Sequence, residues 1–137
     1  MDEVADGIFI GSYEDAMDED AIRARGITTV INLSKRDSPA TDQAVRHVPL
    51  DDSATVDGEQ FKEAVDAALT AHEDGPVLIH CNMGVSRSTA VAATVIAIEK
   101  EKELRDVLRN IEQERPQANP HPALVEQAQQ LLEERRS

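Results

Sequence analysis

The stretch from His80 to Ser88 most constrains the fold of this chain, because it joins two segments that must both be buried. It reads His-Cys-Asn-Met-Gly-Val-Ser-Arg-Ser and contains the only cysteine of the 137 residues. The preceding run, 76–79, is Pro-Val-Leu-Ile, which predicts a short, fully buried strand. The following run, 88–98, is apolar on nearly every face, which is typical of a central helix. We therefore expect a loop between a central strand and a central helix.

A loop in this position is suited to bind phosphate. The free N–H groups at a helix start and the positive end of the helix dipole point at whatever occupies the loop. We expect the loop amides to bind a dianionic phosphate without any metal; the residues concerned are Asn82, Met83, Gly84, Val85, Ser86 and Arg87. The same field favours the thiolate form of Cys81, which is the nucleophilic form.

Four residues of the stretch have distinct predicted tasks. The planar guanidinium of Arg87 is able to bind two phosphate oxygens and to stabilise the charge that develops during transfer. Gly84 permits a tight loop with close backbone approach. Ser88 is placed to donate a hydrogen bond to the sulfur when it leaves in a second step. We expect His80 to orient the loop through backbone contacts rather than to act as an acid or base.

The departing oxygen needs a proton donor. The run 47–52, His-Val-Pro-Leu-Asp-Asp, predicts a strand that ends in two acids. Asp52 is the first candidate for the general acid and Asp51 is the second. In isolation, paired acids in so acidic a chain are typical of a solvated strand end, and the cysteine motif is what favours a catalytic interpretation.

These residues resemble the cysteine-dependent protein phosphatases, specifically the small dual-specificity phosphatases. Their signature, His-Cys-x5-Arg-Ser/Thr, is met in full from His80 to Ser88. The resemblance covers nearly the whole chain. The other matching segments are an opening strand at 6–12, a second strand at 26–34, the general-acid loop at 48–52, and a closing segment with Arg115-Pro116, Asn119-Pro120 and residues 124–127.

The resemblance implies a three-layer, protein-tyrosine-phosphatase-like α/β fold, with a central sheet of four to five mostly parallel strands flanked by helices. It also implies a two-step reaction on phosphorylated proteins. Cys81 attacks phosphorus to give a phosphocysteine, and Asp52 protonates the leaving group and then activates water. A shallow site of this group accepts phosphoserine and phosphothreonine besides phosphotyrosine. Met83 departs from the alanine common in the family, which would alter the pocket rim.

The rest of the chain predicts one α/β domain over residues 1–137. Strands are predicted near 7–11, 29–33, 46–50 and 76–80. Between the last two, apolar residues recur every four positions and indicate an amphipathic helix from about 58 to 72. Two later apolar stripes, 104–111 and 124–132, indicate further helices that contact the core.

The charge and the cysteine content limit the partners and the cellular compartment that we expect. The net charge is −13, with 27 acids against 14 basic residues, so we expect no nucleic-acid and no membrane-surface partner. A single cysteine agrees with a reducing compartment, and the chain start has neither the basic nor the apolar region of a signal peptide, so we expect a cytoplasmic protein. The acidic, lysine-poor composition resembles proteins of salt-loving organisms. The histidines show no metal-ligand spacing, so no metal and no cofactor is assigned.

Two other interpretations remain open at this point. One is a non-enzymatic phosphoprotein-binding module, in which the loop and Arg87 hold phosphate but turnover is lost. The other is a phosphatase that acts on a non-protein phosphomonoester, such as a phosphoinositide or an RNA 5′-phosphate. The sequence predicts neither the physiological substrate nor the oligomeric state.

Overall fold

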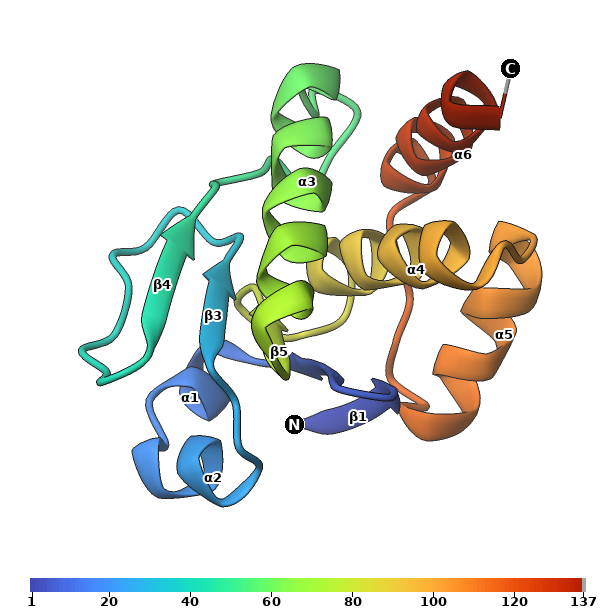
Figure 1. The fold of residues 1–137 in the computed structure, drawn as a ribbon. Helices are drawn as coiled ribbons and strands as arrows, with labels where there is room; N and C mark the ends of the chain where they lie inside the picture. Colours follow the sequence, from blue (N-terminus) through green and yellow to red (C-terminus); the bar gives the residue numbers. More distant parts are fainter. Residues whose placement is uncertain (137) are drawn as a thin grey trace.

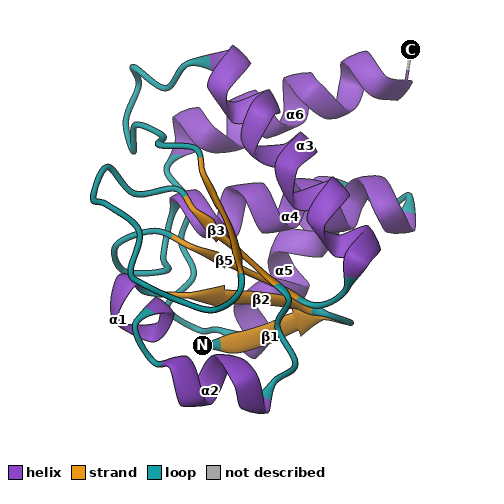
Figure 2. Ribbon diagram, turned by 60° about the vertical axis from the view of Figure 1, so that its left-hand side comes forward, coloured by secondary structure: helices purple, strands orange, loops and turns teal. Residues whose placement is uncertain are grey.

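The computed structural model describes residues 1–136, and its centre is a five-stranded sheet in the order β1-β2-β5-β3-β4 (Figure 1 and Figure 2). The strands are β1 (Asp2–Ala5), β2 (Ile8–Gly11), β3 (Thr29–Asn32), β4 (Ala44–His47) and β5 (Val77–His80). The pairs β2–β5, β5–β3 and β3–β4 are parallel, whereas β1 pairs antiparallel with β2 at one edge. The mostly parallel sheet expected from the sequence is therefore confirmed.

Alternate residues of the inner strands enter two separate apolar cores, one on each face of the sheet. Ile8 and Ile10 of β2 belong to the larger core, whereas Phe9 between them belongs to the smaller one, together with Leu78 of β5. Successive side chains of a strand point to opposite faces, which explains this division. Every residue of β2, β3 and β5 is buried, as expected for parallel strands that are covered on both sides.

Helices cover both faces and give the molecule three layers. One face carries α3 (Gly58–Asp74), α4 (Arg87–Lys100), α5 (Leu104–Glu114) and α6 (Pro122–Arg136), and the other carries the short helices α1 (Tyr13–Ala16) and α2 (Glu19–Ala24) (Figure 1). Helix α4 is enclosed, because it packs against α3, α5 and α6 as well as against β2 and β5. Its residues 87–97 are all buried, in agreement with the apolar pattern of the sequence.

Strand β4 differs from the strand predicted at 46–50. Its ladder with β3 ends at the pair formed by Asn32 and His47. The Leu50 N–H still donates to Leu33 O, but Pro49 has no N–H to offer, and β4 has no second neighbour because it is the edge of the sheet. The chain therefore leaves the sheet before the two candidate acids and carries them on an irregular loop.

Three elements, β1, α1 and α2, were not predicted from the sequence. Each spans only four to six residues, too short to show a periodic apolar pattern. Helix α1 begins with a capping box, in which Ser12 and Asp15 bind each other's backbone N–H groups.

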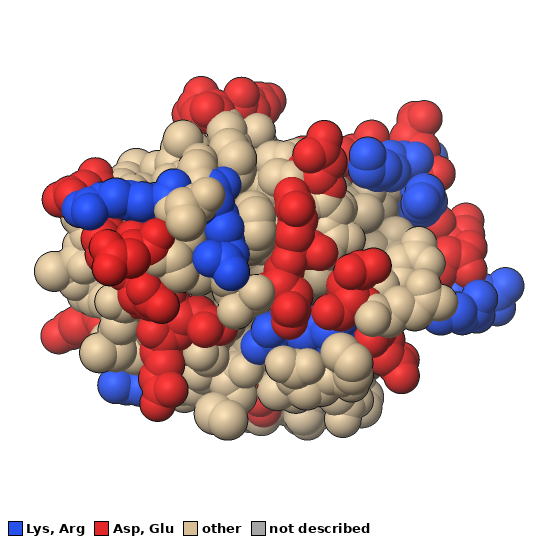
Figure 3. Space-filling model, turned by 90° about the horizontal axis from the view of Figure 1, so that it is seen from below, with Lys and Arg blue, Asp and Glu red and all other residues tan. Residues whose placement is uncertain are grey.

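The surface carries many charged side chains. On the face seen in Figure 3, Asp and Glu side chains are spread between smaller groups of Lys and Arg. Over residues 1–136, none of the helices is both long and apolar enough to cross a membrane.

Candidate active site

The loop between β5 and α4 has its carbonyl groups bound from outside. The Tyr13 N–H donates to Asn82 O at 2.9 Å, and the Asn119 N–H donates to Val85 O at 2.8 Å. Because a peptide group is planar and trans, a carbonyl that points outward turns the next N–H in the opposite direction. The loop amides consequently face the loop interior, as an anion site requires.

Arg115 binds two further carbonyls of the loop. Its side chain is buried, with Nε 2.8 Å from Gly84 O and Nη2 3.3 Å from Met83 O. Its Nη1 forms an ion pair with Asp2 Oδ2 of β1 at 2.7 Å. One buried guanidinium therefore ties this loop, residues 81–86, which we call the phosphate loop, to the first strand of the sheet.

Gly84 occupies the one position of the loop where a side chain has no room. Its φ is +68°, in the region that L-residues with a side chain rarely adopt. A Cβ atom there would lie 2.5 Å from Nη2 of Arg115 and 2.7 Å from Gly11 O. The glycine thus permits the close approach of the loop to Gly11 of β2.

Cys81 lies at the floor of this loop and is only 2% exposed. Its Sγ is 3.3 Å from the hydroxyl oxygen of Ser88 in the first turn of α4. Burial alone raises the pKa of the thiol, but the Ser88 hydroxyl, the N–H groups of Ser88 and Gly84, and the charge of Arg87 together lower the pKa of Cys81 below its ordinary value. The contacts therefore favour the thiolate.

Arg87 is the first residue of α4, and its side chain folds back beside the loop with 8% exposure. Its Nη1 donates to Leu50 O at 3.2 Å and approaches Leu33 O at 3.5 Å. Its Nε is buried and has no hydrogen-bond partner among the described residues. The guanidinium is thus fixed at one end by the segments that follow β3 and β4, and it keeps an unpaired donor that is suited to bind phosphate.

His80 is the last residue of β5 and is fully buried. Burial lowers the pKa of His80 to about 4, so the imidazole is neutral at neutral pH. The neutral ring places its Nδ1 3.3 Å from Cys81 O, where an Nδ1–H donates to that carbonyl. This geometry agrees with an orienting role.

The two candidate acids lie in different surroundings. Asp52 lines the same cavity as Cys81 and Arg87, and its Oδ1 accepts a hydrogen bond from the Ser86 hydroxyl. Asp51 forms an ion pair with Lys35, which lowers the pKa of Asp51, and it lines a separate depression. Of the two, the structure therefore brings only Asp52 to the cavity above the cysteine.

The cavity has a volume of about 550 Å³. One side is formed by the phosphate loop, where Met83 is 71% exposed. Another wall comes from the segment before α6 and from the first residue of that helix, namely Asn119, Pro120, His121 and Pro122. Met83 therefore lies at the rim, where the sequence placed it.

The sequence reasoning missed two residues of this site. Arg115 lies in a segment that resembles the family but has no predicted role, and His121 is considered only among the histidines that lack metal-ligand spacing. In the structure, His121 lines the cavity, and its backbone N–H donates to the Ser86 hydroxyl at 2.8 Å. The dipeptides Arg115-Pro116 and Asn119-Pro120 were the available signal, but neither showed which loop it would contact.

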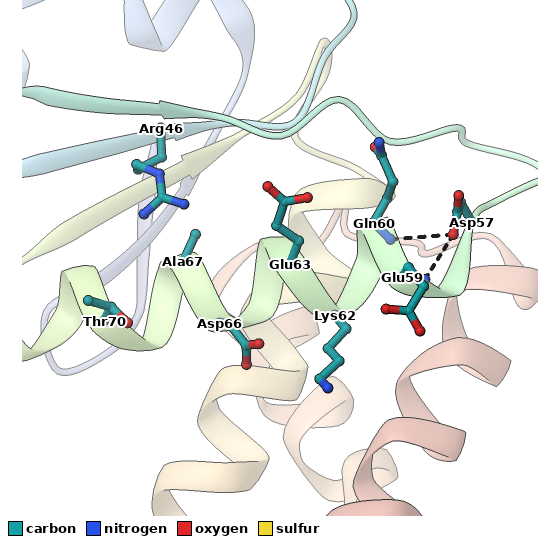
Figure 4. Close-up of a pocket in the computed structure, with 9 residues that line it drawn as sticks. All are labelled: Arg46, Asp57, Glu59, Gln60, Lys62, Glu63, Asp66, Ala67 and Thr70. Atoms are coloured by element: carbon teal, nitrogen blue, oxygen red, sulfur yellow. Dashed lines mark hydrogen bonds between the residues drawn. The ribbon is translucent and has the colours of Figure 1, made fainter.

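A second depression of about 550 Å³ lies between β4 and α3 (Figure 4). Its lining residues are Arg46, Asp57, Glu59, Gln60, Lys62, Glu63, Asp66, Ala67 and Thr70. None of them is a cysteine or any other predicted catalytic residue. Because the two depressions are equal in size, chemistry rather than volume assigns the candidate site to the cavity above Cys81.

Metal ligands do not gather in the part of the chain that the structure describes. Within residues 1–136, no group of three or more His, Cys, Asp or Glu side chains is arranged to hold a metal ion. In the cavity above Cys81, the groups suited to bind an anion are the loop amides and Arg87.

Known proteins are similar to this chain in sequence and in fold. Residues 8–136 match the family described as "Dual specificity phosphatase, catalytic domain". The chain is 30% identical over 131 residues to dual specificity protein phosphatase 15 of Homo sapiens, and 31% identical over 123 residues to dual specificity protein phosphatase 5 of Rattus norvegicus. The matches cover 93% and 87% of this chain but only 44% and 32% of those relatives, so the chain spans less than half of their length.

Solved structures agree over almost the entire chain. The crystal structure of human DUSP28 superposes with a TM-score of 0.92 at 26% identity, and the match covers 99% of this chain and 98% of that one. A mouse putative dual specificity phosphatase complexed with zinc tungstate gives a TM-score of 0.89 at 27% identity, over 98% of this chain and 89% of that one. The three-layer fold implied by the sequence resemblance is confirmed. The chain belongs to the dual specificity phosphatase catalytic-domain family.

Proposed function

We propose that this domain hydrolyses phosphate esters on proteins through a phosphocysteine intermediate. The observation that carries the proposal is the environment of Cys81. Its thiol has a lowered pKa and lies under inward-facing loop amides, beside Arg87 and in the same cavity as Asp52. A nucleophile, an anion clamp and a proton donor therefore line one cavity, which is the set that phosphoryl transfer to a thiolate needs.

In the first step, the Cys81 thiolate attacks phosphorus while the bond to the leaving oxygen breaks. The loop amides and Arg87 bind the three other phosphate oxygens and stabilise the charge on them. The leaving oxygen takes a proton from the carboxyl group of Asp52. The products are the dephosphorylated side chain and a phosphocysteine.

In the second step, water attacks the phosphocysteine, and the Asp52 carboxylate takes a proton from that water. The sulfur–phosphorus bond breaks and the sulfur leaves as a thiolate. Ser88 lies 3.3 Å from this sulfur and donates a hydrogen bond to it. Inorganic phosphate is released and Cys81 is ready for the next cycle.

The proposed substrates are phosphotyrosine and also phosphoserine and phosphothreonine in proteins. Family membership supports phosphoprotein substrates, and the relatives are named for dual specificity. The loop adds only Arg87 as a charged side chain at positions 82–87, so the extra basic groups suited to polyphosphorylated lipids or RNA ends are absent from the loop itself. We rank phosphoproteins above both.

The first experiment measures hydrolysis of 4-nitrophenyl phosphate by the wild type and by Cys81→Ser, with a chelator present and at low and high salt. We expect metal-free turnover by the wild type and none by the variant. Acid quenching with a 32P-labelled substrate should trap the phosphocysteine in the wild type. Because Cys81 is the only cysteine, alkylation by iodoacetate reports on that site alone.

Two outcomes would redirect the proposal. A folded wild type that binds phosphate but shows no turnover at either salt concentration would indicate a phosphoprotein-binding module. Turnover that strongly prefers phosphoinositides or RNA 5′-phosphates over phosphopeptides would indicate a non-protein substrate.

The choice of general acid has its own test. Asp52→Asn should lower kcat/KM for an ester with a poor leaving group by roughly 10²-fold or more. Asp51→Asn serves as the matched control, and we expect a change of less than about threefold because Asp51 pairs with Lys35 outside the cavity. Equal, mild losses in both variants would contradict the assignment.

A further inference from the structure

The hydroxyl of Ser86 has partners that its position in the helix does not explain. Ser86 is the N-cap residue of α4, where a serine ordinarily accepts a hydrogen bond from the first turn of its own helix. It makes no such side-chain bond here. Its Oγ instead contacts the backbone N–H of His121 and the carboxylate of Asp52. The side chain is largely buried, with 9% exposure for the residue.

The direction of both Ser86 hydrogen bonds follows from which of the atoms carry a proton. A backbone N–H is only a donor, so the Ser86 oxygen must accept from His121, at 2.8 Å. A hydroxyl has one proton, and the remaining partner is Oδ1 of Asp52. Ser86 therefore donates to the carboxylate, and the hydroxyl is not free to rotate away without losing one of the two bonds.

This contact is the one hydrogen bond of Asp52 within residues 1–136. Asp52 lies on the irregular loop that follows β4, where no strand partner holds the backbone. Ser86 in contrast lies at the start of α4, the most enclosed helix of the fold. The carboxylate is thus attached to the rigid interior through a single side chain.

We propose that Ser86 is the positioning residue of the general acid, an inference that rests on the function proposed above. Its hydroxyl occupies Oδ1 of Asp52, so the transferable proton is carried by Oδ2. That proton passes to the leaving oxygen as its bond to phosphorus breaks and the bond from Cys81 forms. The His121 N–H fixes the hydroxyl in turn, so the segment before α6 takes part in aiming the acid.

The test compares two aryl esters that differ in their need for a proton. Phenyl phosphate has a poor leaving group and requires the acid, whereas 4-nitrophenyl phosphate has a good one and requires it less. Ser86→Ala should lower kcat/KM for phenyl phosphate roughly tenfold, the size expected for one hydrogen bond to a charged group. The loss on 4-nitrophenyl phosphate should stay below about threefold. Inhibition by inorganic phosphate should be unchanged, because the loop amides remain.

Matched variants separate positioning from a general disturbance. Ser86→Thr keeps the hydroxyl and should restore the leaving-group pattern of the wild type. Ser53→Ala removes a neighbouring hydroxyl that bonds Thr55 rather than Asp52, and it should leave the pattern unchanged. In an Asp52→Asn background, Ser86→Ala should have no further effect on phenyl phosphate.

The inference and the proposed function fail in different ways. If Ser86→Ala lowers kcat/KM equally for both esters, or if its effect persists in the Asp52→Asn background, Ser86 does not act through Asp52. If the folded wild type hydrolyses neither ester, the catalytic function itself is refuted, and the positioning role with it.

Discussion

Arg115 offers a perturbation whose effect follows from its contacts. The residue lies outside the signature stretch, yet its guanidinium binds two carbonyls of the phosphate loop and the carboxylate of Asp2. Arg115→Met keeps an unbranched apolar stem of similar length and removes these three interactions together. We expect this change to lower both the stability of the fold and the affinity of the loop for phosphate.

The magnitude can be worked out contact by contact. Leaving Gly84 O without its buried donor costs about 1–3 kcal/mol, and Met83 O, which is only partly buried, costs about 1 kcal/mol. Asp2 is 40% exposed and regains water, so losing the ion pair adds no more than about 1 kcal/mol. The sum of about 2–5 kcal/mol corresponds to a fall in Tm of roughly 8–20 °C for a domain of this size.

Thermal unfolding followed by circular dichroism measures this fall in Tm, and inhibition by inorganic phosphate measures the affinity of the loop for phosphate. Arg105→Met is the control, because Arg105 is an exposed arginine of the nearby α5 and should shift the free energy of unfolding by less than about 0.5 kcal/mol. Asp2→Asn keeps an acceptor for Arg115, so its Tm should lie between those of Arg115→Met and Arg105→Met. If Arg115→Met unfolds at the wild-type temperature and binds phosphate as the wild type does, the role assigned to the outward carbonyls is refuted.

Three further predictions concern the thiol, the loop glycine and the surface charge. Burial raises the pKa of Cys81, and Ser88 is the main group that lowers it. Ser88→Ala should therefore raise the pKa of Cys81 and move the pH profile of its alkylation by iodoacetate to higher pH. Ser88→Thr keeps the hydroxyl and should leave this profile unchanged. Gly84→Ala should destabilise the fold by more than Gly26→Ala. Both glycines have positive φ, which costs an alanine about 1–2 kcal/mol, but only at Gly84 would the new Cβ also meet other atoms. Equal Tm values for the two variants would contradict this. With 27 acids and 14 basic residues, the free energy of unfolding should rise with NaCl up to molar concentrations, and a salt-independent urea midpoint would count against repulsion as a limiting factor.

The sequence pattern predicted the parts of the fold that depend on local periodicity. The buried strand before Cys81 and the apolar helix after it were both found, since a segment without a polar face has nowhere to lie except the interior. The amphipathic helix predicted at 58–72 is α3, which continues to Asp74 and ends at Gly75. Strand β1 could not be predicted, because Asp2-Glu3-Val4-Ala5 has no strand pattern and is placed by pairing with β2.

The candidate acids show the limit of sequence reasoning at the site. Asp51 and Asp52 are adjacent and chemically identical; the sequence ranked Asp52 first, but it showed no contact of either carboxylate. Asp51 forms an ion pair with Lys35, whereas Asp52 lines the cavity above Cys81 and accepts a hydrogen bond from Ser86. Both partners are distant in sequence, and only the folded chain shows which carboxylate each one contacts.

The sequence by itself predicted the candidate nucleophile, the arginine and the loop that joins a buried strand to a buried helix, because these lie within nine consecutive residues whose spacing is local. Tertiary structure decided everything that needs two distant segments to meet. Arg115 and Asp2 are 113 residues apart, and Ser86 lies 34 and 35 residues from Asp52 and His121. Such contacts depend on how strands pair and helices pack over the whole chain. The support of the loop and the position of the candidate acid Asp52 are therefore decided only when the sheet and α4 are assembled.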